Sequence, residues 1–108
     1  YLSPRDYHRI HAPERCRLEQ AFWIQGARWS VAPAVLDRRA VLAVNERVSL
    51  RLVTDHGPLA FVLVGATNVG RIRVVGVPPG HAGTLSPAPA FARGEELARF
   101  EMGSTVVL

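Results

Sequence analysis

The stretch of residues 46–64 constrains the fold of this chain most strongly. Residues 46–54 are rich in β-branched and aliphatic side chains, and residues 59–64 form a nearly continuous apolar run, typical of a strand buried on both faces. Between them stands Asp55-His56-Gly57-Pro58, a run of turn-forming residues. The stretch therefore predicts a β-hairpin with its bend at residues 55–58.

Two further regions continue this pattern of short apolar runs. Residues 18–24 predict a strand that ends before Gly26, and residues 69–77 predict another that is interrupted at Gly70. Residues 77–92 are rich in Pro, Gly and Ala and predict an irregular loop.

Two segments are less clear-cut. Residues 95–100 have the propensity for a helical turn, but the Gly-Ser-Thr and Val-Val that follow favour a strand, and residues 35–44 fit either a short helix or a loop. Short strands with frequent turn signals predict a mainly β fold, an antiparallel β-sandwich or barrel-like domain with little helix.

Size and composition fit one small globular domain. The chain has 108 residues, of which 48% are hydrophobic. It contains no apolar run long enough to span a bilayer and no signal peptide.

The basic residues limit the chemistry of the chain. All 13 are arginine, and the net charge of +4 suits anionic phosphate headgroups, although ordinary solubility explains it equally well. No basic run is dense enough to predict nucleic-acid binding. Because there is no lysine, neither a lysine Schiff base nor an internal lysine anchor for pyridoxal phosphate can form in this chain.

The single cysteine and the spacing of the histidines argue against disulfides and metals. Cys16 has no partner for an internal disulfide, and its flanking Arg15 and Arg17 are expected to lower its pKa, yet a bystander role is favoured over a nucleophile. His8 and His11 are three residues apart but lack a Cys pair or further histidines, so no metal site is predicted.

The Gly103-Ser104-Thr105 step supports an unusual backbone reaction. The Ser104 oxygen can attack the carbonyl of Gly103 through a five-membered ring, and Gly103 has no Cβ to hinder the attack. The resulting ester can eliminate and hydrolyse, which leaves a pyruvoyl group on the new N-terminus. In isolation, a surface turn is the more common meaning of Gly-Ser-Thr.

Four ordered blocks resemble the bacterial phosphatidylserine decarboxylase proenzyme family. Residues 1–13 resemble its histidine-containing motif, and residues 94–106 resemble its self-cleavage segment. Residues 45–48 and 64–72 resemble two further blocks of the family, in the same order. Departures are Ala32, where the family tends to have Asn, Ala98 in place of a frequent Gly, and a shorter loop after Gly76.

The resemblance implies roles for the residues that match the motifs. Ser104 is the nucleophile of self-cleavage at Gly103-Ser104 and the precursor of a covalent pyruvoyl cofactor. His11 matches the histidine of a Ser-His-Asp arrangement, and His8 matches a second histidine implicated in decarboxylation. The aspartate of that arrangement lies upstream of the histidine motif in the family and is not identified here. Arg5 and Arg9 could bind phosphate or carboxylate or simply be solvated.

The resemblance also implies an activity and a location. The expected reaction is decarboxylation of phosphatidylserine to phosphatidylethanolamine and carbon dioxide, at the cytoplasmic face of the bacterial membrane. The expected partners are that anionic membrane and the remainder of a proenzyme that splits into α and β chains, while homo-oligomerisation stays open. Residues 1–108 are expected to be a single truncated catalytic domain, without an N-terminal membrane-associating part and a C-terminal tail, and inactive in isolation.

Three alternatives stay open. A degenerate family member could act as a non-catalytic, β-rich binding module. A carrier domain would need an exposed attachment lysine, which the chain lacks. A pyruvoyl enzyme that acts on a water-soluble amino acid is the third.

Overall fold

Nine short strands and no helix make up the described part of the chain. The computed structural model describes residues 2, 5–27, 45–66, 72–101 and 105–107. The strands are β1 (Arg9–His11), β2 (Cys16–Ile24), β3 (Arg47–Thr54), β4 (Gly57–Val64), β5 (Ile72–Val74), β6 (Ala82–Thr84), β7 (Ala90–Phe91), β8 (Glu96–Phe100) and β9 (Thr105–Val107). The prediction of a mainly β fold is confirmed.

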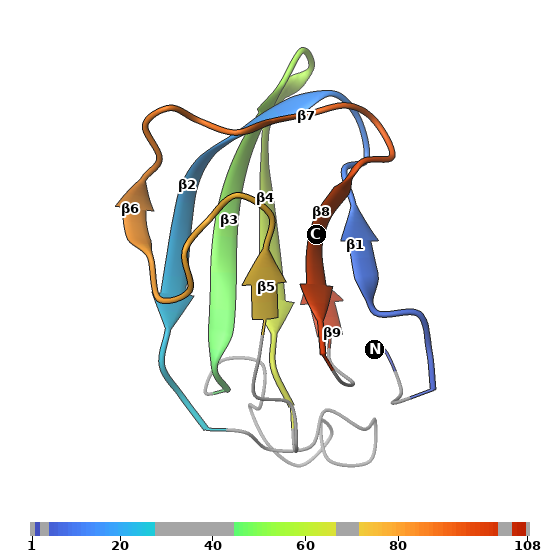
Figure 1. The fold of residues 1–108 in the computed structure, drawn as a ribbon, viewed down its shortest axis with the longest axis vertical. Helices are drawn as coiled ribbons and strands as arrows, with labels where there is room; N and C mark the ends of the chain where they lie inside the picture. Colours follow the sequence, from blue (N-terminus) through green and yellow to red (C-terminus); the bar gives the residue numbers. More distant parts are fainter. Residues whose placement is uncertain (1, 3–4, 28–44, 67–71, 102–104, 108) are drawn as a thin grey trace.

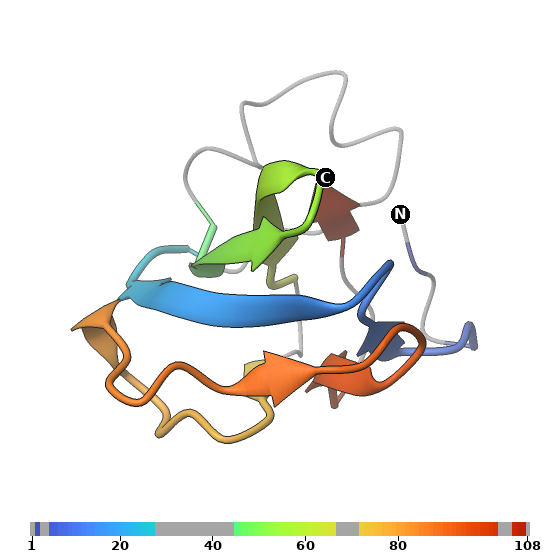
Figure 2. The same cartoon turned by 90° about the horizontal axis from the view of Figure 1, so that it is seen from above.

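The strands form two antiparallel sheets that face each other (Figures 1 and 2). One has three strands in the order β1-β8-β5, and the other has the order β6-β2-β3-β4-β9, with β7 also paired to β2. Neither sheet closes on itself, so the described residues form a sandwich rather than a barrel.

The core lies between the two sheets. Inward positions alternate with exposed ones along β2 and β3, as a sheet with one wet face requires. The buried cluster joins residues of both sheets, among them Leu18, Leu50, Leu63, Ala98 and Phe100. Each fully buried leucine contributes about 2–3 kcal/mol relative to an exposed one.

The predicted hairpin is confirmed, with a tighter bend than the sequence indicated. Thr54 pairs with Gly57, so the bend is Asp55-His56, and Gly57 and Pro58 belong to β4. Gly57 has φ = 114°, which a residue with a Cβ rarely adopts. The Thr54 hydroxyl donates to the Gly57 carbonyl and accepts from the His56 N–H, at 2.8 and 3.0 Å.

Two expectations about burial and loops are corrected. Residues 59–64 are not buried on both faces throughout: Ala60 is exposed, and only the end of β4 at Leu63 and Val64 is fully buried. The Pro- and Gly-rich region 77–92 contains β6 and β7, because both pair with the edge of β2. Tertiary pairing there overrides weak local propensity.

The other strand predictions can be compared with the strands of the described residues. Residues 18–24 lie within β2, and residues 96–100 are strand rather than helix, as β8, which begins one residue after Glu95. Of the strand predicted at residues 69–77, β5 covers residues 72–74, and the prediction is wrong at residues 75–77, which form a turn. Gly70 and residues 35–44 lie outside the described residues.

A buried asparagine connects the ends of three strands. Asn45 is fully buried, and its side-chain amide donates to the Gly65 carbonyl at 2.8 Å. The neighbouring Glu46 N–H donates to the Ala27 carbonyl, and the Gly65 N–H donates to the Glu46 carbonyl, both at 2.8 Å. Residues 45–48 therefore have a structural function, since they hold the end of β2, the start of β3 and the end of β4 together.

Replacing Asn45 with alanine is expected to lower the free energy of unfolding by about 1–3 kcal/mol, because it leaves the buried Gly65 carbonyl without this donor. Denaturant unfolding measures the change. Ser49→Ala, at a half-buried position of the same sheet, is the control and is expected to change it by less than about 0.5 kcal/mol. Equal stability of Asn45→Ala and wild type would contradict the role of the amide.

A side-chain contact joins the β1–β2 connection to the hairpin bend. The His56 ring nitrogen Nδ1 lies 3.0 Å from a carboxylate oxygen of Glu14. The Thr54 hydroxyl, and after it His56, hold the pKa of Glu14 below its ordinary value. His56 therefore has a structural contact at the hairpin bend.

The lowered pKa of Glu14 predicts a pH-dependent stability difference. A carboxyl group whose pKa is lower in the folded state stabilises the fold above its unfolded pKa of about 4.3, and this contribution is lost as the pH falls through the folded value. Glu14→Gln is expected to be less stable than wild type at neutral pH, with the gap closing in acid. Unfolding curves over that pH range test this, and a gap that stays constant would contradict it.

Candidate functional site

The two histidines of the first motif lie on opposite faces of β1. The backbone of His8 extends the β1–β8 ladder, because its carbonyl accepts the Phe100 N–H at 2.9 Å. His8 points inward, where its ring meets the edge of the Phe100 ring, whereas His11 is exposed on the outer face. The turn at residues 5–6 does not bring the two rings to one site.

His11 is held in one orientation. Its Nδ1 lies 2.8 Å from the Gly94 carbonyl, which can only accept, so Nδ1 carries the proton. In the neutral imidazole with this tautomer, Nε2 presents a lone pair, which accepts the Tyr7 hydroxyl at 2.7 Å. The two rings are stacked, with centroids 5.7 Å apart. An imidazole with a fixed tautomer and a basic Nε2 is equipped to take a proton.

Among the described residues, His8 carries a buried polar side-chain atom that has no hydrogen-bond partner. Its Nδ1 bonds to the Asp6 carbonyl, which assigns the proton to Nδ1. The other ring nitrogen, Nε2, is buried and has no hydrogen-bond partner among the described residues. Such atoms are rare in folded proteins, because each costs the desolvation of a polar group. This nitrogen is therefore a candidate for proton exchange with a group outside the described residues.

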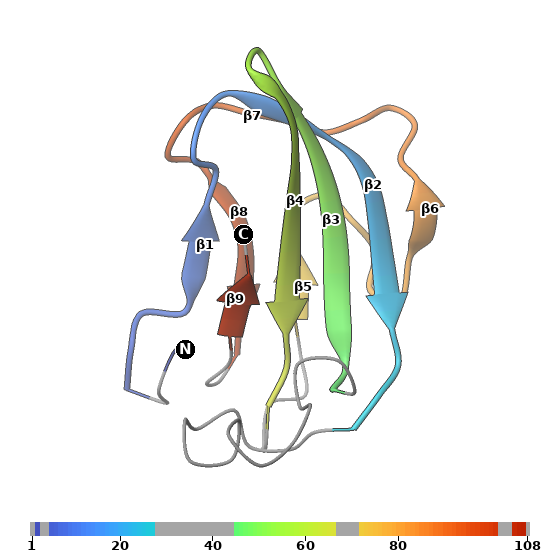
Figure 3. The same ribbon diagram turned by 180° about the vertical axis from the view of Figure 1, so that it is seen from behind.

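The predicted cleavage step joins the two sheets. Gly103 and Ser104 lie outside the described residues, so their roles stay predictions. On one side, Glu101 follows β8 and accepts a hydrogen bond from Arg73 of β5 at 2.7 Å. On the other side, Thr105 opens β9 and pairs with Val64 of β4 (Figure 3).

The register places the histidines at different distances along β8. His8 lies opposite Phe100, near the end of β8 that leads into the step, and His11 lies opposite Glu96. Four residues of strand separate these positions, about 13 Å. His8 is thus nearer in register to the start of the connection that contains Ser104.

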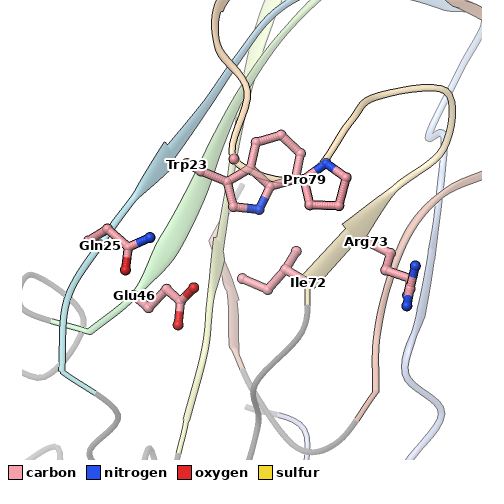
Figure 4. A pocket seen from close by; sticks show the side chains of 7 residues that line it. Trp23, Gln25, Glu46, Ile72, Arg73 and Pro79 are labelled. Atoms are coloured by element: carbon pink, nitrogen blue, oxygen red, sulfur yellow. The ribbon is translucent and has the colours of Figure 1, made fainter.

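A cavity of about 450 Å³ opens at the same end of the sandwich (Figure 4). Its apolar lining includes Trp23 from β2, Ile72 from β5 and Pro79. Its polar lining includes Glu46 and Arg73. The Glu46 carbonyl accepts a hydrogen bond from the Gly65 N–H, and Gly65 follows Val64, which pairs with Thr105. The Arg73 guanidinium donates to the Glu101 carboxylate. Residues that line the cavity therefore contact the chain on both sides of the Gly103-Ser104 step.

An apolar floor with a few polar groups suits a small molecule that has a polar head. Sequence reasoning did not identify this cavity, because its lining residues come from segments that are far apart in the chain. The available signal was the position of Glu46 and Ile72 inside two blocks that resemble one family.

Cys16 is not activated. Its side chain is 4% exposed, and burial raises the pKa of its thiol. The expectation that Arg15 and Arg17 lower this pKa is wrong: Arg15 is exposed in the bend before β2, and Arg17 alternates with Cys16 along β2, so its side chain lies on the exposed face of the strand.

The described residues contain no cluster of three or more His, Cys, Asp or Glu side chains that could hold a metal ion. They also form no helix with the length and apolarity needed to cross a bilayer.

Known proteins of one family are similar to this chain over its whole length. The phosphatidylserine decarboxylase family matches residues 1–108. A phosphatidylserine decarboxylase proenzyme of Alkalilimnicola ehrlichii is 46% identical over 99% of this chain and 41% of its own length. Proenzymes of the same name from Delftia acidovorans and Myxococcus xanthus are 42% and 44% identical over all of this chain. The chain spans about two fifths of the length of these curated relatives.

Proposed function

The chain belongs to the phosphatidylserine decarboxylase family, and on this premise we propose that the protein converts phosphatidylserine to phosphatidylethanolamine and carbon dioxide. The observation that carries the proposal is the match over all 108 residues, which includes both histidines and the Gly103-Ser104 step. The relatives are named proenzymes, which supports processing into more than one chain. Nothing favours a non-catalytic binding module.

We propose Ser104 as the source of a covalent pyruvoyl group. The described surroundings fit such a group: a buried ring nitrogen of His8 lacks a partner, and the chain is anchored on both sides of the step through Glu101 and Thr105. When present, a pyruvoyl group supplies an electron-accepting carbonyl for the amine-bearing carbon of the substrate.

The chain's own residues move protons in this proposal. His11, with its basic Nε2, takes the proton of the Ser104 hydroxyl during self-cleavage. His8 takes up a proton at Nε2, the ring nitrogen that carries none in the Nδ1–H tautomer, and passes it to the substrate carbon that has lost carbon dioxide. The motif supports these roles, while the register places His8 nearer the step, so the variants described in the Discussion are needed to separate them.

Location and partners belong to the same proposal. The substrate is a membrane lipid, and the net charge of +4 suits an anionic surface, so we place the protein peripherally at the cytoplasmic face of the bacterial membrane. The remainder of the proenzyme completes the enzyme, because the chain spans about two fifths of its relatives.

The intact mass of the full-length gene product under denaturing conditions tests the proposal. Two pieces that separate at Gly103-Ser104, with the smaller one blocked to Edman degradation, are expected. A single uncleaved polypeptide would contradict the pyruvoyl chemistry. Release of carbon dioxide from phosphatidylserine, but not from water-soluble amino acids, is the expected specificity.

A further inference from the structure

Three arginines form a row across the outer face of the three-stranded sheet. Arg9 of β1 pairs in register with Arg99 of β8, and Arg99 pairs with Arg73 of β5. Neighbouring strands lie about 4.8 Å apart, so the three backbone positions span about 10 Å. Their side chains are 55%, 46% and 44% exposed.

The row carries more positive charge than its acidic neighbours neutralise. Glu96 lies 2.9 Å from Arg9 and 4.0 Å from Arg99, and Glu101 lies 2.7 Å from Arg73. Three guanidinium groups thus face two carboxylates. Like charges directly opposite one another destabilise a sheet, so the fold itself gives no reason to align them.

Apolar side chains border the row on both sides. Tyr7 is 64% exposed and stacks on His11, which shares the outer face of β1 with Arg9. At the other edge Val75 is 44% exposed, and it lines a shallow depression of about 190 Å³ together with Arg73 and Arg99. Arginines combined with exposed aromatic and aliphatic side chains are typical of surfaces that lie on a bilayer.

We propose that this face of the β1-β8-β5 sheet, which we call the arginine face, docks onto an anionic phospholipid surface (Figure 1). The arginine row binds lipid phosphates, and Tyr7 and Val75 enter the headgroup region. His11 lies on the same face, so docking brings it to the layer that holds lipid headgroups. The inference deepens the proposed function by naming the surface that meets the lipid.

Binding of the full-length gene product to vesicles tests the proposal. Vesicles of phosphatidylglycerol and phosphatidylcholine in equal parts contain no phosphatidylserine, so sedimentation with them measures docking without decarboxylation. Wild type is expected to bind these vesicles, to bind pure phosphatidylcholine far more weakly, and to dissociate as salt is raised. Failure of decarboxylation would leave this result unaffected.

Paired variants locate the binding surface. Arg9→Gln with Arg99→Gln is expected to weaken partitioning about 30-fold, which corresponds to about fivefold for each arginine. Arg17→Gln with Arg51→Gln removes the same charge from the outer face of the six-stranded sheet and is expected to leave partitioning unchanged. This control is matched, because Arg51 also has an acidic neighbour, Glu19, at 3.8 Å.

A misfolded variant would also lose vesicle binding, so a variant that is expected to bind more strongly serves as a further test. Glu96→Gln removes a carboxylate from the row and is expected to strengthen partitioning about fivefold. Equal losses in the two arginine pairs, an unchanged Glu96→Gln, or a wild type that does not distinguish anionic from neutral vesicles would each overturn the proposal.

Discussion

Ser104→Ala is expected to leave the full-length gene product as one uncleaved chain without decarboxylase activity. Alanine has no hydroxyl to attack the Gly103 carbonyl, and it cannot be converted to a pyruvoyl group. Denaturing electrophoresis and intact mass measure the cleavage, and carbon dioxide release measures the activity. Both losses are expected to be complete, because no other residue can supply the prosthetic group at that position.

The neighbouring hydroxyl provides a matched control for Ser104. Thr105→Val keeps a β-branched residue at the first position of β9 and removes only the hydroxyl, so cleavage is expected to proceed. Two pieces from Ser104→Ala would show that another residue breaks the chain, and the assignment of the pyruvoyl precursor would be wrong.

His11→Gln is expected to slow self-cleavage by about 10²–10⁴-fold, the usual contribution of a general base. Glutamine can still donate to the Gly94 carbonyl, but it has no basic nitrogen in place of Nε2. The rate of appearance of the two pieces after synthesis measures the effect.

His8→Gln is expected to cleave normally and then to decarboxylate about 10²–10⁴-fold more slowly. The readout is turnover per cleaved molecule, so incomplete processing does not mimic the effect. His56→Gln, which removes an exposed imidazole that contacts Glu14, is the control for both variants and is expected to affect neither step. Failure of His8→Gln to cleave while His11→Gln cleaves would exchange the two roles, in the direction that the β1–β8 register favours.

Much of the fold could be predicted from local pattern. The hairpin of β3 and β4 follows from two apolar runs on either side of Asp55-His56, because neighbouring residues specify both the strand preference and the turn. The strands β6 and β7 could not be predicted in the same way, since Pro- and Gly-rich residues become strands there only by pairing with the edge of β2.

The candidate site also has one part that the sequence predicts and one part that it does not. His8 and His11 could be selected from their motif, and their opposite faces follow from strand geometry once β1 is extended. The cavity at Trp23 and Arg73 could not be selected, because its walls come from segments far apart in the chain.

The amino-acid order was therefore sufficient for the family, the hairpin and the selection of candidate reacting residues, because these depend on short motifs and on periodicity within one segment. The orientation of each histidine, the burial that raises the pKa of Cys16 and the alignment of Arg9, Arg99 and Arg73 depend on which strands become neighbours. Strand pairing joins residues as many as 90 positions apart, from Arg9 to Arg99, and no local pattern specifies such a contact.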